Sequence, residues 1–257
     1  MAQGGAVVIA NIISWLTTSS HWQGPDGIPI RIWEHLRYSL IAVAIALIIA
    51  LPLGVLIGHT RRGTFLVTAA NAIRALPTLG LLIYFVVLIS PHIHGKGDAA
   101  YLIPTEIVLV VLAIPSILSN TYAGIQSVEP EVRDAARGMG MMGRQVAFQV
   151  ELPNALPLII SGIRSAMLQV IATATIAAYV SLGGLGRFII DGQSQHDYTQ
   201  MASGAVLVAL LALVIDLVLA FVQRYAVSPG VSGRLSRKSV LMGNAPPQAV
   251  TASTASG

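Results

Sequence analysis

Residues 129–153 read EPEVRDAARGMGMMGRQVAFQVELP, and this stretch is the only long polar interruption between strongly apolar runs. Pro130 suits the first turn of a helix, where its missing N–H costs little. Glu131 then lies at the positive end of the helix dipole and Arg137 near the negative end. Glycines at 138, 140 and 143 break this helix, and a second short helix is predicted over 144–150. The stretch therefore predicts a helix–turn–helix with an exposed charged face, which suits docking.

The first of these two helices is predicted to be amphipathic. Val132, Ala136 and Met139 recur at i, i+4 and i+7 and form an apolar stripe, with Ala135 beside it. The arginines of the same stretch place it on the cytoplasmic side of a membrane by the positive-inside rule. The segment is thus expected to lie against the membrane and to present its charged face to a cytoplasmic partner.

The spacing within this stretch resembles the EAA loop of ABC-importer permeases. The family pattern is an acidic residue and two alanines, then a glycine, an aliphatic residue and Leu-Pro at fixed distances. Aspartate replaces the usual glutamate, and valine the usual isoleucine, which keeps charge and apolarity. The segments ELPNALPLIISGIR (151–164) and SLGGLG (181–186) are similar to the glycine betaine/carnitine/choline (osmoprotectant) branch, and the resemblance covers residues 33–225. The residues that match the loop pattern are Asp134, Ala135, Ala136, Gly140, Val150, Leu152 and Pro153.

This resemblance implies an all-α membrane protein with about five transmembrane helices. The bundle would be like that of type I ABC importer permeases and would carry a cytoplasmic coupling helix. Implied partners are a dimer of ATPase subunits that bind ATP and Mg²⁺, a second permease chain, identical or paralogous, and an extracytoplasmic substrate-binding protein. The chain has no G-x-x-x-x-G-K-[ST] motif, so it is expected to be a transport subunit without a cofactor of its own. The residues implied in coupling to the ATPase are Glu131, Asp134, Ala135, Ala136, Gly140, Gly143, Leu152 and Pro153.

Composition supports a membrane protein. Hydrophobic residues make up 54% of the chain and charged residues only 10%, against about 25% charged in a soluble domain. The net charge of +4 is explained by basic residues on cytoplasmic segments, so a nucleic-acid partner is not expected. The absence of cysteine excludes disulfides, thiol nucleophiles and Cys-ligated metals.

Five spans are predicted, over 39–58, 70–90, 102–124, 156–180 and 201–225. With residues 129–153 inside, the N-terminus lies outside and the C-terminus in the cytoplasm of a prokaryotic cell. Eleven Lys and Arg residues then fall at or near the cytoplasmic face and four outside. Residues 1–37 are predicted to be an interfacial and elbow segment in contact with membrane lipid, 38–225 the permease domain, and 226–257 a disordered tail.

Two other motifs point to chemistry that their context disfavours. Residues 138–143 satisfy G-x-G-x-x-G, but this dinucleotide pattern acts only between a strand and a helix, and here it follows a charged helix. His92, His94 and Asp98 form an H-x-H cluster, but the glycines of their loop give a metal ion no rigid frame.

Polar residues inside the predicted spans are candidates for a substrate pathway, because hydrocarbon penalises them. Polar packing between helices is an equally weighted interpretation. For Asp216 a structural partner, with Arg164 as the candidate, is favoured over a cation-binding role. The candidate pathway residues are Asn120, Ser165, Gln169, Thr173, Thr175, Tyr179 and Asp216.

The leading functional prediction is a permease that imports a small quaternary-ammonium osmoprotectant, driven by a separate ATPase. The alternatives are an ABC permease for another small solute such as an amino acid, and an ATP-independent secondary transporter. Against the latter stand the loop spacing and the absence of an evident inverted repeat.

Overall fold

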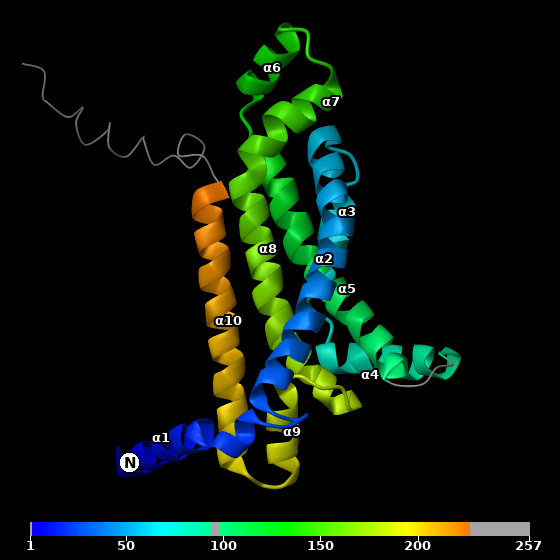
Figure 1. The fold of residues 1–257 in the computed structure, drawn as a ribbon. Coiled ribbons are helices and arrows are strands. Elements are labelled where there is room, and N and C mark those ends of the chain that lie inside the picture. Colours follow the sequence, from blue (N-terminus) through cyan, green and yellow to red (C-terminus); the bar gives the residue numbers. More distant parts are fainter. Residues whose placement is uncertain (1, 94–97, 227–257) are drawn as a thin grey trace, which may run out of the picture.

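The computed structural model describes residues 2–93 and 98–226, and every regular element within these ranges is helical. The long helices run side by side, and short ones cap both ends of the bundle (Figure 1). Their bounds are α1 Ala2–Thr17, η1 Ser19–Trp22, α2 Ile28–Thr60, α3 Thr64–Ile73, α4 Thr78–Ile89, η2 Ser90–His92, α5 Ala99–Gln126, α6 Pro130–Gly138, α7 Gly143–Gln145, η3 Val146–Glu151 (a π-helix), α8 Leu152–Ala174, η4 Thr175–Val180, α9 Gly186–Ser194 and α10 Tyr198–Ala226.

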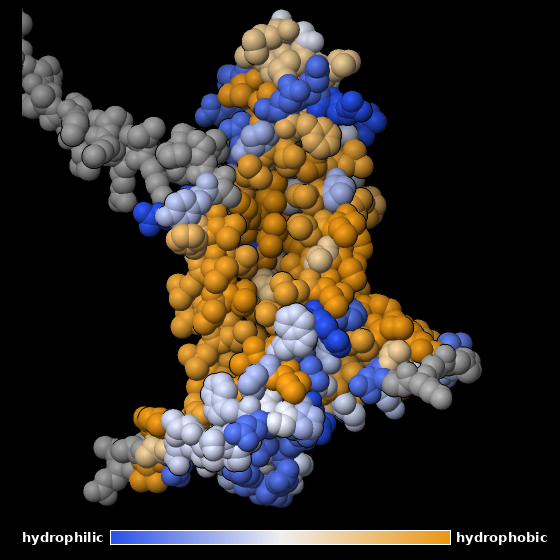
Figure 2. Space-filling model, viewed as in Figure 1, coloured by the Kyte–Doolittle hydropathy of each residue, from blue (hydrophilic) through white to orange (hydrophobic). Residues whose placement is uncertain are grey.

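The predicted number of spans is confirmed. In the described part of the chain, four helical stretches are long and apolar enough to cross a membrane: α2, α5, the run Gly143–Val180, and α10. The pair α3 and α4 makes a fifth if it counts as one broken span. Figure 2 shows the corresponding apolar belt between two polar ends. Such a belt is what a bilayer of about 30 Å requires.

The second predicted span differs from a simple helix. A single helix was expected over 70–90, but the chain stops at Ile73 and restarts at Thr78, with a bend of 94° between the two helical segments. Pro77 explains the break, because proline has no N–H to donate and disfavours helical geometry in the residue before it. As a result α4 runs across the bundle rather than along it (Figure 1).

The N-terminal boundary also differs. Helix α2 begins at Ile28 and continues to Thr60, so the expected division at residue 37 falls inside a continuous helix. Helix α1 lies across one end of the bundle, at the end opposite α6 (Figure 1). The tail expected over 226–257 lies almost wholly outside the described residues.

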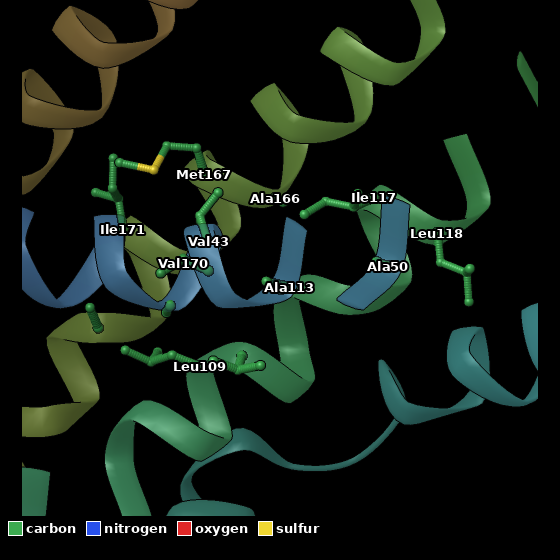
Figure 3. Packing of buried hydrophobic residues seen from close by; sticks show 14 of the residues in the cluster. Val43, Ala50, Leu109, Ala113, Ile117, Leu118, Ala166, Met167, Val170 and Ile171 are labelled. Carbon is green, nitrogen blue, oxygen red and sulfur yellow. The ribbon is translucent and has the colours of Figure 1, made fainter. Parts of the chain in front are cut away.

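The core is formed where α2, α5 and α8 pack together. Its buried side chains are mostly small or aliphatic, such as Ala113 and Ile117 of α5 and Ala166 and Val170 of α8 (Figure 3). At Gly162 the approach of α8 to α5 is so close that a Cβ atom would lie 2.6 Å from Asn120 Cβ. Small residues of this kind allow helix backbones to meet inside a membrane.

The motif SLGGLG closes the end of the bundle away from α6. Glu34 Oε2 accepts a hydrogen bond of 2.8 Å from the N–H of Gly184. Next to it, the Nε2 atom of the buried His35 lies 2.9 Å from the carbonyl oxygen of Ile171. A short loop is thereby fastened to α2, which gives the motif a structural role.

Candidate coupling loop and intramembrane polar face

Helix α6 forms as the sequence predicts and ends in a Schellman motif. Gly140 has φ +85°, a conformation that favours glycine. The N–H of Met141 donates to the carbonyl of Ala136 at 3.2 Å, and that of Gly140 to the carbonyl of Arg137 at 2.9 Å. These two bonds satisfy carbonyls that a helix end would otherwise leave free. The chain then turns and re-enters the bundle at Gly143.

A buried ionic clasp holds α6 to the bundle. Glu151, only 1% exposed, lies between Arg133 of α6 and His59 at the end of α2. Its Oε1 atom is 2.9 Å from Arg133 Nε, although that N–H is not directed well enough for a hydrogen bond. Its Oε2 atom is 2.7 Å from His59 Nδ1, which donates because an ionised carboxylate only accepts. Arg133 also donates to the carbonyl of Ile125.

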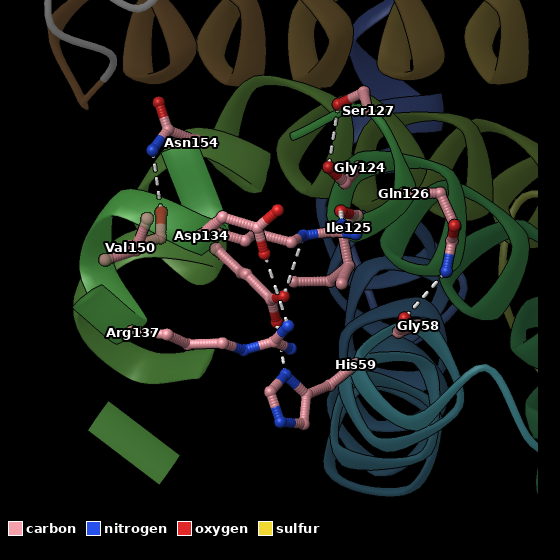
Figure 4. Close-up of polar contacts among 12 residues, drawn as sticks. Gly58, His59, Gly124, Ile125, Gln126, Ser127, Asp134, Arg137, Val150 and Asn154 are labelled. Carbon is pink, nitrogen blue, oxygen red and sulfur yellow. Dashed lines mark hydrogen bonds and ion pairs between the residues drawn. The ribbon is translucent and has the colours of Figure 1, made fainter. Parts of the chain in front are cut away.

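Further hydrogen bonds join the neighbouring helix ends. Gln126 Nε2 donates to the carbonyl of Gly58 at 2.7 Å and so ties the end of α5 to that of α2. Ser127 and Asn154 close local bonds to Gly124 and Val150 (Figure 4).

The second short helix predicted over 144–150 is not a separate element, because α7, η3 and α8 form one helical run. Leu152 and Pro153 lie in it, at the start of α8.

The apolar stripe expected on α6 is not what faces the bundle. Of its members only Ala136 is buried, at 2% exposure, and the other buried residue of α6 is Arg133. Val132 and Met139 are exposed, the latter to 77%. The exposed surface of α6 and the turn after it therefore presents apolar and small side chains. The remaining expected coupling residues, Glu131, Asp134, Ala135, Gly140 and Gly143, are exposed as well.

A polar groove of about 370 Å³ separates α6 from the end of α2. Its rim carries Arg61 and Arg137, and its floor includes Arg133 and Glu151. Asp134 also lines it and lies 3.5 Å from Arg137 in an exposed pair. Exposed pairs of this kind contribute little to stability, so their side chains are free to rearrange onto a partner.

Deeper in the bundle, some of the expected pathway residues meet in one polar cluster. Ser116 of α5 donates to Gln169 Oε1 of α8 at 3.2 Å, and Asn120 donates to the carbonyl of Ser116 at 2.8 Å. Arg74, at the break between α3 and α4, donates to Ser116 Oγ at 2.8 Å. The predicted span 70–90 contains Arg74 near its start, and sequence reasoning counted this arginine among the basic residues at or near the cytoplasmic face.

The other expected pathway residues lie apart from this cluster. Thr173 and Thr175 donate to backbone carbonyls of their own helical run, and Ser165 and Tyr179 are exposed. Asp216 of α10 is held by two hydrogen bonds from Arg164 of α8, one of them 2.6 Å from Nη2 to Oδ2. The expected pairing of these two residues is confirmed.

Sequence reasoning missed three groups that the fold brings together: the clasp, the position of Arg74, and a buried carboxylate. The clasp joins residues 59, 133 and 151, which no local pattern connects. Glu106 of α5 has both carboxylate oxygens buried and without a hydrogen-bond partner among the described residues. Its position in a span was the only available sequence signal for Glu106.

Within the described ranges, which exclude His94, no group of three His, Asp or Glu side chains could hold a metal ion.

Comparison with known proteins agrees with this architecture. Residues 50–231 match the family described as "Binding-protein-dependent transport system inner membrane component". The chain belongs to this family. It is thus a membrane permease subunit of an ABC transporter, and ATP hydrolysis lies with a separate subunit.

Relatives within this permease family are named as osmoprotectant transporters. The glycine betaine/carnitine/choline transport system permease protein OpuCB of Bacillus subtilis is 36% identical over 201 residues, 78% of this chain and 88% of that protein. The osmoprotectant import permease protein OsmW of Salmonella typhimurium is 36% identical over 185 residues, 72% of this chain and 84% of its own length.

Solved permease structures share the fold. A chain of the inward-facing MetNI methionine ABC transporter matches with a TM-score of 0.66 and 23% identity, over 76% of this chain and 94% of that one. A chain of an amino acid ABC transporter crystallised with histidines matches with a TM-score of 0.59 and 18% identity, over 83% and 96%. The predicted type I importer bundle is therefore confirmed.

Proposed function

We propose that this permease imports small quaternary-ammonium osmoprotectants of the glycine betaine, carnitine and choline type. The observation that carries the substrate class is the 36% identity to OpuCB and OsmW over more than four fifths of each relative's length. The methionine transporter shares the fold at 23% identity, which is too distant to argue for the same solute.

The proposed docking element for the ATPase is the segment 129–143, which comprises α6 and the turn after it. Its exposed small and apolar side chains, Ala135 and Met139 among them, suit a complementary groove on a partner. The clasp through Glu151 would pass a movement of α6 to both α2 and α8. ATP and Mg²⁺ would be bound by the partner, whose closure would tilt the spans as rigid bodies.

The proposed orientation places the N-terminus outside and the C-terminus in the cytoplasm, in the plasma membrane of a prokaryote. With Arg74 counted inside the membrane, ten of the fifteen Lys and Arg residues then lie at or near the cytoplasmic side and four outside. In this orientation α1 lies at the outer surface as an interfacial helix, and Trp15 is its aromatic anchor. Reporter fusions after Arg144 and after Arg187 should give cytoplasmic and extracytoplasmic signals, respectively.

Further proposed partners are a second permease chain, identical or paralogous, and an extracytoplasmic binding protein. The support for a second chain is a polar face formed by Asn71 of α3 and Arg74 just after it, both exposed in the single chain, and by the half-buried Ser119 of α5. Ionisable groups at membrane depth face a bundle interior or a water-filled cavity rather than lipid. A second chain would enclose this face.

The function is tested by reconstituting the whole importer in liposomes with ATP inside. Labelled glycine betaine, carnitine, choline and methionine are offered with their binding proteins outside. ATP-dependent uptake of at least one quaternary ammonium compound, and none of methionine, is the expected result. Uptake of methionine alone would overturn the proposed substrate class, and uptake independent of ATP would overturn the coupling.

A further inference from the structure

The break between α3 and α4 places a guanidinium group near the middle of the membrane. Helix α3 starts at Thr64, directly after the end of α2. Arg74 follows ten residues later, which is about 15 Å along a helix, half of the hydrocarbon thickness. Its bonding partner Ser116 lies ten residues before the end of α5, so the second helix gives the same depth independently.

Arg74 has no acidic partner among the residues that the structure describes. None of the ion pairs between those residues includes it. In contrast, Arg164 on α8 is neutralised by Asp216. Since a charged side chain at membrane depth is unfavourable without a counter-charge, the cation at position 74 is suited to an anionic group that arrives from outside the chain.

The groups around Arg74 hold it in place without neutralising it. The 1%-exposed Ser116 accepts one N–H of the guanidinium at 2.8 Å and donates its own proton to Gln169. A guanidinium has five N–H donors in a rigid fork, so the others remain for a ligand. Asn71, one turn earlier on α3, accepts from Ser119 at 3.1 Å and extends the polar face.

The arginine is the group at this break that favours an anion. Helix α3 ends at Ile73 and α4, with 12 residues, begins at Thr78, so a negative and a positive helix end lie at the same break and their dipoles oppose each other. The guanidinium fork of Arg74 matches a planar carboxylate with two parallel hydrogen bonds.

We infer that Arg74 binds the carboxylate of a zwitterionic substrate during passage and so distinguishes carboxylate-bearing osmoprotectants from choline. Glycine betaine and carnitine carry a carboxylate, whereas choline carries a hydroxyl group beside the same trimethylammonium head. The inference rests on the proposed function, because it needs a substrate of this class. The part of the substrate that this chain would recognise is its carboxylate.

The first test compares transport of glycine betaine and choline by the complete importer with Arg74→Gln. We expect kcat/KM for glycine betaine to fall about tenfold or more, as for a lost hydrogen bond to a charged group, while that for choline changes less than about threefold. Arg74→Lys should restore part of the loss. The control is Arg37→Gln, which removes an exposed arginine beside Tyr38 at the outer end of α2 and should affect both substrates alike. An equal loss of both substrates in Arg74→Gln would overturn the inference.

A second test does not depend on which substrates the binding protein delivers. The chain has no cysteine, so Asn71→Cys introduces a single thiol beside Arg74 in the permease. Glycine betaine should slow its reaction with a small aqueous thiol reagent, choline should not, and Arg74→Gln should abolish the protection. Equal protection by both compounds, or a thiol that never reacts, would overturn the inference. Failure of the wild-type importer to move any quaternary ammonium compound would instead reject the proposed function.

Discussion

The position of α6 depends on the carboxylate of Glu151, and Glu151→Gln removes its charge while keeping its shape. The carboxylate is 1% exposed and contacts both Arg133 and His59. Removing one partner of a buried ion pair typically costs about 3–5 kcal/mol, because the other charge stays buried without compensation. At the lower end of this energy range, local opening of α6 should become about 100-fold more frequent.

Amide hydrogen exchange of the permease in nanodiscs measures this opening. Protection over 130–138 should fall by about two orders of magnitude in Glu151→Gln, and protection in the middle of α5 and α8 should not change. Asp134→Asn is the matched control, since it breaks an exposed pair with Arg137 on the same helix and should alter exchange less than about threefold. Unchanged protection of α6 in Glu151→Gln would refute the role given to the clasp.

Three further substitutions, one of them with a matched control, test the loop and the packing. Ala135→Trp, at an exposed site on α6, should leave the permease folded but reduce co-purification of the ATPase; full retention would argue against docking there. Gly140→Val, at φ +85°, should destabilise the turn by about 1–2 kcal/mol and lower ATP-dependent uptake. Gly186→Ala would place a Cβ atom 2.2 Å from the carbonyl oxygen of Thr175, so detergent thermostability should fall, whereas Gly138→Ala, with nothing within 4 Å, should match the wild type.

Much of this fold follows from local sequence signals. Apolar runs of sufficient length predict the spans, because a bilayer demands them. The ends of α6 follow from Pro130 and the glycines that begin at position 138. Pro77 carries the signal for the broken helix. That signal is ambiguous, since proline also occurs inside continuous spans such as α2 and α5.

The buried polar groups were beyond such reasoning. The hydrophobic stripe on α6 predicted that the helix would lie against the membrane with its charged face exposed, but Arg133 is buried against the bundle because Glu151 lies opposite. That carboxylate is 18 positions away, and His59 is 92 positions from Glu151. Charges so far apart in sequence show no periodicity, and only the packing of α2 against α8 reveals their proximity. The same applies to Arg74, because its depth in the bundle depends on the break between α3 and α4.

The close contacts among α2, α5 and α8 make these three helices a single stiff unit. Where Gly162 meets Asn120, and where a Cβ atom at Gly54 would lie only 2.7 Å from Thr121, backbones touch with little soft side chain between them. Helix α5 alone, with 28 residues, is about 42 Å long, and a tilt of about 10° about its midpoint would move each end by about 3.6 Å in opposite directions. A movement of α6 would therefore be passed along these helices toward the Glu34–Gly184 contact at the far end. The same stiffness would carry a force applied at that far end back to α6.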